Sequence, residues 1–144
     1  FLPQEKKTVA RLAQPGGNVD YERFHREVLK PLSKGSEIVY QRYDCQANRF
    51  LAPLILKPKN IHIVEGVYAL HPELHSYYDY KIFFSVDPKI QAARIVKRNP
   101  PHVQNKFFTE WIPLKEQYFS AYNIRASCDT IIDTTTDRWQ IVYE

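Results

Sequence analysis

Glu65 has the setting that points most directly to chemistry, because it follows a short apolar run and precedes a glycine. The run, residues 61–64, is typical of a strand buried on both faces of a parallel sheet. Glu65 would then lie at the carboxyl end of that strand, the edge where open α/β sheets bind ligands. Gly66 allows a sharp turn or a close ligand approach. A carboxylate there could hold a hydrated magnesium ion beside phosphates, and the alternative is a solvated acid that ends a strand.

Arg94 and Arg98 form a second candidate feature, since residues four apart share one face of a helix. Two guanidinium groups on one face could clamp the phosphates of a nucleotide, with Lys97 beside them. The alternative is a solvated basic face near the end of a helix, which the helix dipole favours in any case.

Asp20 follows the glycine pair Gly16-Gly17, which suggests a carboxylate held at a shaped corner of the backbone. A carboxylate can accept two hydroxyl protons and therefore suits a sugar diol, although Asp20 can equally be a simple helix N-cap. Tyr43 and Asp44 end a predicted strand and could stack on a ring while fixing a polar group. Tyr43 can also be an ordinary aromatic residue of a strand.

Composition narrows the function classes. The 144 residues are 44% hydrophobic with ten tyrosines, which predicts one folded domain rather than disorder. The net charge of +4 suits an anionic ligand, but the basic residues form no clustered stripe, so we expect no nucleic-acid surface. No run is long enough to cross a membrane. Cys45 and Cys128 match no metal or redox spacing and are expected to be reduced thiols in a cytoplasmic protein.

The elements that must position these residues alternate along the chain. Helices are expected over residues 3–13, 20–35, 87–98 and 107–122, and extended segments over residues 38–43, 51–57, 61–65, 80–86 and 130–133. Strands that alternate with helices predict an α/β fold, with a parallel sheet flanked by helices. His71 and His75 are four apart, but a proline follows the first, so a zinc-protease helix is disfavoured.

Several segments together resemble one family. They are FLP (1–3), GGNVDY (16–21), YD (43–44), IVEGVY (63–68), DYKIF (79–83) and RIVKRN (94–99). Their order and rough spacing resemble the uridine kinase branch of the P-loop kinases, which also includes phosphoribulokinase. EWIPL (110–114), YF (118–119) and NIR (123–125) look like its bacterial uridine-kinase-like subgroup. The resemblance covers nearly the whole chain.

The resemblance implies a P-loop NTPase-like fold and ATP-dependent transfer of a phosphoryl group to a hydroxyl of a small molecule. The expected acceptor is the 5′-hydroxyl of uridine or cytidine, and the expected cofactors are ATP and Mg²⁺. By resemblance, Glu65 is the acid near magnesium, and Asp20 and Tyr43 contact the ribose diol and the base. Arg94 and Arg98 are the lid arginines that meet the phosphates. Such charge clamping supplies most of the catalysis in phosphoryl transfer.

Two departures qualify these expectations. The sequence contains no Gly-x-x-x-x-Gly-Lys-Ser/Thr, the loop that cradles ATP phosphates. In the family this loop precedes the segment where this chain begins, so we expect an N-terminally incomplete kinase domain that lacks the first strand. Asn48 falls near the position of a base-contacting histidine, which keeps other acceptors open, such as pantothenate or ribulose phosphate. A non-catalytic binding or regulatory module on a kinase scaffold is also left open, as is the oligomeric state, a homo-oligomer included.

Overall fold

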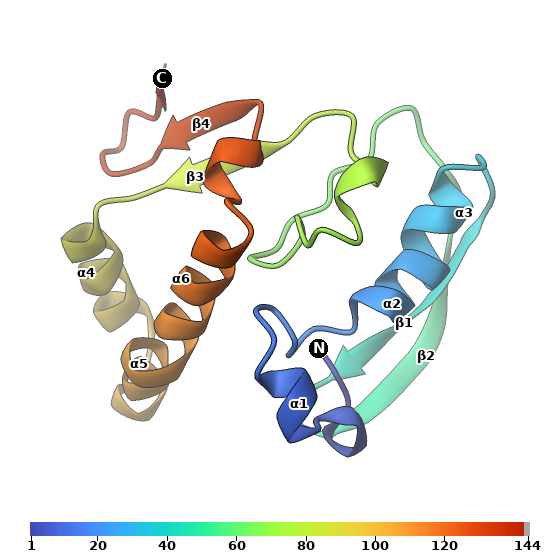
Figure 1. Ribbon diagram of the computed structural model, residues 1–144, viewed down its shortest axis with the longest axis horizontal. Coiled ribbons are helices and arrows are strands. Elements are labelled where there is room, and N and C mark those ends of the chain that lie inside the picture. Colours follow the sequence, from blue (N-terminus) through green and yellow to red (C-terminus); the bar gives the residue numbers. More distant parts are fainter. Residues whose placement is uncertain (143–144) are drawn as a thin grey trace. The chain divides into compact units, whose positions relative to one another are not determined.

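The computed structural model describes residues 1–142 as a mixed α/β protein (Figure 1). Its internal contacts divide the chain into two compact units, Phe1–Tyr78 and Asp79–Glu144. Each unit has its own buried apolar residues: Leu2, Leu29, Ile38 and Leu74 in the first, and Ile95, Tyr118, Ile124 and Ile131 in the second. The single domain and the P-loop NTPase-like fold expected from the sequence stay predictions.

The first unit begins with short helical turns instead of the helix predicted over residues 3–13. A 3₁₀ turn, η1 (Gln4–Lys6), is followed by the single α-helical turn α1 (Val9–Leu12). The prediction of one continuous helix is therefore wrong. The physical reason lies at Thr8, whose extended backbone and side-chain bond to the Arg11 N–H (3.1 Å) make it an N-cap that starts a new helix.

The next helical stretch agrees with the sequence and comprises α2 (Tyr21–Phe24), the π-helical turn η2 (His25–Leu29) and α3 (Lys30–Leu32). It begins at the predicted cap Asp20 and ends before Gly35, whose φ of +64° gives the left-handed turn expected of a helix terminus. In η2 the Lys30 N–H bonds to the carbonyl of His25 immediately before Pro31. The backbone immediately before Pro31 thus forms a widened turn.

A β-hairpin completes the regular structure of the first unit. Strands β1 (Ile38–Asp44) and β2 (Arg49–Leu56) pair in an antiparallel register, with Ile38 opposite Leu56 and Asp44 opposite Arg49. The 3₁₀ turn η3 (His75–Tyr77) lies near the end of this unit. Both strands were expected, and the structure adds that they form a hairpin.

Residues 61–66 form no strand, so the strand predicted to carry Glu65 is wrong. Ile61 and Ile63 are 79% and 89% exposed, instead of being buried on both faces of a sheet. A strand needs a neighbour to satisfy its backbone groups. Within the described residues, β1 and β2 pair with each other, β3, β4 and β5 form the other sheet, and this segment has no strand partner.

The second unit contains a three-stranded sheet of order β3-β4-β5. Strands β3 (Ile82–Ser85) and β4 (Thr130–Asp133) are parallel, and β5 (Gln140–Val142) pairs antiparallel with β4. The parallel pair confirms part of the predicted sheet, whereas β5 was not expected. The Phe83 ring lies 5.1 Å from the Phe119 ring, so one face of the sheet packs against helix α6 (Ile112–Ala121).

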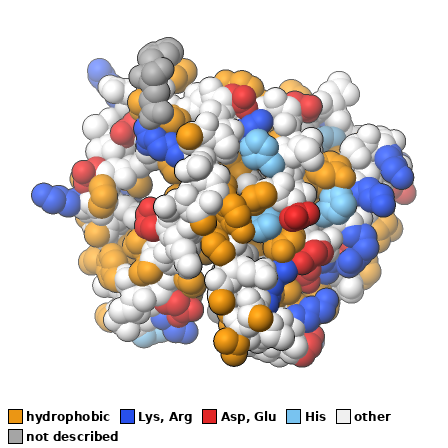
Figure 2. All heavy atoms as spheres, in the orientation of Figure 1, with side chains coloured by type: hydrophobic (Ala, Val, Ile, Leu, Met, Phe, Trp, Pro, Cys, Tyr) orange, Lys and Arg blue, Asp and Glu red, His pale blue; other side chains and the backbone are white. Residues whose placement is uncertain are grey.

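Helices connect the two parallel strands. Asp87 caps α4 (Pro88–Arg98), which ends at the residue the sequence predicted, and Pro100 is the N-cap of α5 (Pro101–Lys106). The π-helical turn η4 (Phe107–Trp111) then leads into α6, and the 3₁₀ turn η5 (Arg125–Ser127) precedes β4. None of the helices in the described part of the chain combines the length and apolar character needed to span a membrane. On the face shown in Figure 2, basic and acidic side chains are interspersed.

Candidate functional site

The residues predicted to form a site are divided between the two units. Asp20, Tyr43, Asp44 and Glu65 belong to the first unit, and Arg94 and Arg98 belong to the second.

Asp20 is the most buried of these residues, with 7% of its surface exposed. Its Oδ1 accepts the backbone N–H of Arg23 (3.1 Å), which confirms the N-cap. Its Oδ2 lies 3.6 Å from Arg23 Nε and 3.9 Å from Lys6 Nζ, and neither Oδ2 nor Nε has a hydrogen-bond partner among the described atoms. A buried carboxylate oxygen therefore keeps an unused capacity to accept protons.

Arg23 fixes the position of this carboxylate relative to the hairpin. Its Nη1 donates to Glu27 Oε2 (3.1 Å) and to the carbonyl of Gln41 in β1 (2.8 Å). Its guanidinium also lies 4.8 Å from the centre of the Phe50 ring in β2. One side chain thus joins the helix that Asp20 caps to both strands of the hairpin.

The glycine pair before Asp20 forms a tight corner around Arg11. Gly16 has a φ of +74°, and a Cβ atom added to Gly17 would lie 1.9 Å from the carbonyl oxygen of Arg11. The Arg11 side chain donates to the carbonyls of Gly17 and Val19, both at 3.0 Å. It also forms a bidentate ion pair with Glu22 (2.6 and 2.9 Å). The predicted shaped corner is confirmed, and Arg11 is the residue that sequence reasoning missed.

An aromatic stack lies beside this corner. The rings of Tyr21 and His71 are parallel within 14° and 3.8 Å apart, and Arg11 lies 4.2 Å from the Tyr21 ring centre. His71 is 6% exposed, and burial lowers the pKa of its imidazole. Sequence spacing brought attention to His71 only as one member of a metal pair. In the structure it packs against the helix capped by Asp20.

Tyr43 and Asp44 help to close the β1–β2 hairpin. The Tyr43 hydroxyl donates to Asn48 Oδ1, and its ring lies 5.2 Å from the Phe50 ring. Asp44 Oδ1 accepts the N–H groups of Gln46 (2.9 Å) and Ala47 (3.0 Å), and these bonds lower the pKa of the Asp44 carboxyl. The structure therefore gives both residues a turn-forming role, and the predicted contact with a substrate stays a prediction.

Glu65 is exposed and lies in an irregular segment instead of at a strand end. Within the described residues, no three His, Cys, Asp or Glu side chains are grouped so that they could hold a metal ion. Magnesium is commonly held by one or two carboxylates together with substrate phosphates. The setting of Glu65 does not fit that arrangement, and we derive no chemical step through a magnesium ion.

Arg94 and Arg98 both lie on the exposed surface of α4. The Nη2 of Arg94 donates to the carbonyls of Thr134 (2.7 Å) and Thr135 (3.3 Å), in the loop that follows β4. Arg94 therefore anchors this loop, which favours a structural role for it. The predicted phosphate clamp stays a prediction for both residues.

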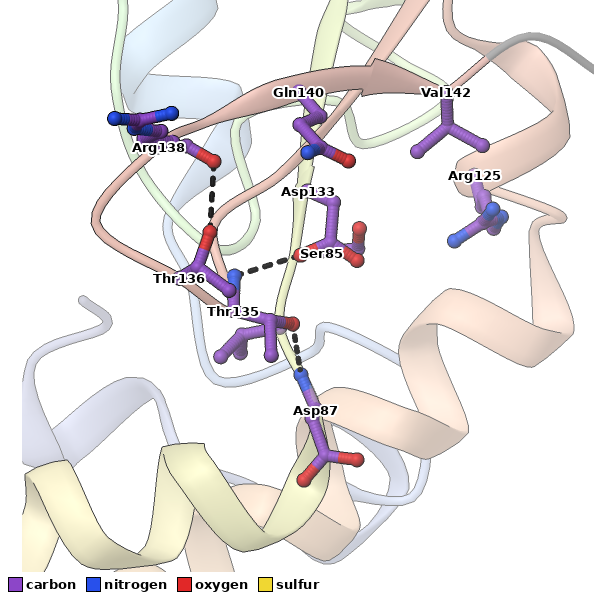
Figure 3. Close-up of a pocket in the computed structure, with 10 residues that line it drawn as sticks. Ser85, Asp87, Arg125, Asp133, Thr135, Thr136, Arg138, Gln140 and Val142 are labelled. Carbon is purple, nitrogen blue, oxygen red and sulfur yellow. Dashed lines mark hydrogen bonds between the residues drawn. The ribbon is translucent and has the colours of Figure 1, made fainter.

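A pocket of about 580 Å³ lies in the second unit, where the two parallel strands end (Figure 3). Its lining includes Ser85, Asp87, Arg125, Asp133, Arg138 and Gln140. The carboxyl ends of parallel strands are the usual ligand edge of an α/β sheet. Sequence reasoning placed this edge at Glu65, but the same signal, an apolar strand followed by an acid, also occurs at residues 130–133.

No protein-family model matches the chain, and no curated protein matches it in sequence.

Proposed function

We propose that this chain belongs to a small-molecule kinase that transfers a phosphoryl group from ATP to the hydroxyl of a nucleoside such as uridine or cytidine. The observation that carries the proposal is the buried Asp20 carboxylate, whose Oδ2 has no hydrogen-bond partner within residues 1–142. The ordered set of segments that resemble uridine kinases supports it. A P-loop NTPase-like fold, built around the parallel pair β3–β4, is part of the same proposal.

Asp20 is suited to hold a diol because its two oxygens are used differently. Oδ1 accepts the N–H of Arg23, whereas Oδ2 is buried and has no hydrogen-bond partner among the described atoms, so it is the oxygen that we assign to a hydroxyl of the acceptor. A hydrogen bond to a charged group contributes roughly 1.5–3 kcal/mol. Arg23 Nε and Lys6 Nζ place positive charge 3.6 and 3.9 Å from this oxygen.

ATP, when bound, would supply the phosphoryl group, and the residues of this chain would bind and orient the acceptor. The sequence contains no Gly-x-x-x-x-Gly-Lys-Ser/Thr loop, so no residue named here is assigned to cradle the triphosphate. The role of this chain in the proposal is therefore confined to the acceptor.

The proposal is tested by substituting Asp20 with asparagine in the full-length natural protein. The remaining side-chain oxygen can still cap the helix, but the amide nitrogen cannot accept a proton. We expect KM for uridine or cytidine to rise about tenfold or more, with KM for ATP nearly unchanged. Asp137→Asn, at an exposed position of the second unit, is the matched control. Equal KM values for Asp20→Asn and the parent would overturn the proposal.

A second candidate function is a non-catalytic nucleoside-binding module. It is favoured by the exposed, irregular setting of Glu65 and by the structural roles of Asp44 and Arg94. Calorimetric titration with uridine, run beside an assay of ATP consumption, separates the two functions. Uridine binding that depends on Asp20 without any ATP consumption would establish the module and exclude the kinase.

A further inference from the structure

A polar row crosses the sheet of the second unit at the floor of the pocket. Ser85 in β3 is the register partner of Asp133 in β4, and Asp133 is the partner of Gln140 in β5. Side chains at directly opposed positions lie on the same face of a sheet. Phe83 and Ile131, two residues earlier on their strands, belong to the same face, and Ile131 is buried. Three hydrogen-bonding side chains thus extend an otherwise apolar face.

The loops beside this row are held in place by their own hydrogen bonds. Thr135 donates its N–H to Asp133 Oδ1 (2.7 Å), and its Oγ1 accepts the N–H of Asp87 (2.9 Å). Hydrogen bonds from the Thr135 hydroxyl and N–H lower the pKa of Asp133, so this carboxyl is ionised at neutral pH. Thr134 is joined to the Ser85 carbonyl through both its N–H (2.8 Å) and its hydroxyl (2.9 Å). The pocket is therefore formed before any ligand arrives.

Charged side chains of both signs surround the row. Asp87 uses Oδ1 to cap α4 through the N–H groups of Lys89 and Ile90. Figure 3 shows Arg125 and Arg138 on opposite sides of the row, with the guanidinium of Arg138 turned outward from Gln140. Arg138 is exposed and stands at the rim. The row offers acceptors and donors for hydroxyl groups, and the rim offers a cation for an oxyanion.

We propose that this pocket binds a polyhydroxylated oxyanion, a small molecule whose hydroxyls meet Ser85, Asp133 and Gln140 and whose anionic group meets Arg138 when that exposed side chain turns from the rim toward the row. A volume of about 580 Å³ accommodates a molecule of this kind. Val86 and Val142 add apolar surface for the carbon skeleton. The proposal goes beyond the kinase function and does not depend on it, because Asp20 takes no part in it.

Calorimetric titration of the full chain tests the proposal with four probes: ribose 5-phosphate, gluconate, ribose and inorganic phosphate. The first two carry the oxyanion as phosphate or carboxylate and therefore distinguish the source of the negative charge. We expect at least one of them to bind ten or more times more tightly than both ribose and inorganic phosphate. Equal binding of inorganic phosphate, or no binding of either polyhydroxylated oxyanion at millimolar concentration, would overturn the proposal.

Two variants test which side chains contact the ligand, and a third is the control. Arg138→Gln should weaken the bound oxyanion at least tenfold and leave ribose unchanged. Gln140→Leu should weaken the oxyanion and ribose alike and leave inorganic phosphate unchanged. Lys106→Gln removes one exposed positive charge of the same unit outside the pocket and should change neither. Amide chemical shifts of residues 85–87 and 133–140 should move on titration. Parental affinity in both Arg138→Gln and Gln140→Leu would overturn the proposal.

Discussion

Gly17→Ala is predicted to destabilise the first unit, because no side chain fits at that corner. An added Cβ would lie 1.9 Å from the carbonyl oxygen of Arg11 and 3.0 Å from that of Gln14. Ordinary van der Waals contact begins near 3.4 Å, so the Arg11 carbonyl and position 17 would have to separate by about 1.5 Å (3.4 minus 1.9). Both groups are backbone, and neither can turn away as a flexible side chain would.

The expected loss of stability follows from the hydrogen bonds that this displacement would disrupt. Gly17 accepts the Arg11 Nε–H at 3.0 Å and donates its N–H to Gln14 at 2.9 Å. Each such bond contributes about 1 kcal/mol, and overpacking strain adds roughly 1–3 kcal/mol. We therefore expect the free energy of unfolding to fall by about 2–4 kcal/mol.

Urea unfolding followed by far-UV circular dichroism measures this change, and hydrogen exchange of amides in residues 1–78 localises it. Gly66→Ala is the matched control, since no atom in the described part of the chain lies within 4 Å of its added Cβ. It should be neutral or slightly stabilising. Gly35→Ala, with open space but a φ of +64°, should cost about 1 kcal/mol and separates strain from collision. The reasoning fails if Gly17→Ala is as stable as Gly66→Ala.

Three further predictions concern the first unit. Arg23→Met should lower the free energy of unfolding by about 2–4 kcal/mol in urea titrations, because it removes the nearer cation of Asp20 and the donor to the Gln41 carbonyl; a loss under about 0.5 kcal/mol would contradict this. Burial lowers the pKa of His71 below 6.5, so the unfolded chain binds the proton more readily. Stability should therefore fall as the pH drops below about 6.5, and His71→Phe should reduce that dependence; an unchanged dependence would refute the assignment. Glu65→Gln should leave the free energy of unfolding within about 0.5 kcal/mol of the parent, whereas a large loss would show that Glu65 has buried partners.

The two prolines that follow helical turns show how far local sequence reasoning reaches. Pro31 follows the π-helical turn η2, and Pro113 follows η4, with Ile112 bonding back to Phe107. A proline ring collides with the carbonyl four residues earlier, and a widened turn relieves this collision. The sequence shows a proline inside each of the helices expected over residues 20–35 and 107–122. The form of the distortion required the backbone.

Local sequence reasoning reached less far at the candidate site. Asp20 was singled out from the glycine pair before it, and the structure shows it as a buried helix N-cap. The partners that hold it could not be read from the sequence, since Arg23 reaches across to Gln41 and Arg11 reaches Glu22, eleven residues away. Asp44 and Arg94 have the residue types expected of a site, but nearby backbone groups engage them.

The sequence by itself determined where helices begin at Asp20 and Asp87, and which segments form β1, β3 and β4. These features depend on neighbours within a few residues, so short-range rules suffice for them. Only the tertiary structure decided that residues 61–66 form no strand, that β5 completes a sheet, and that Ser85, Asp133 and Gln140 lie in one row. Strand pairing depends on partners that lie far away in sequence, and an apolar run alone does not determine which strand it pairs with.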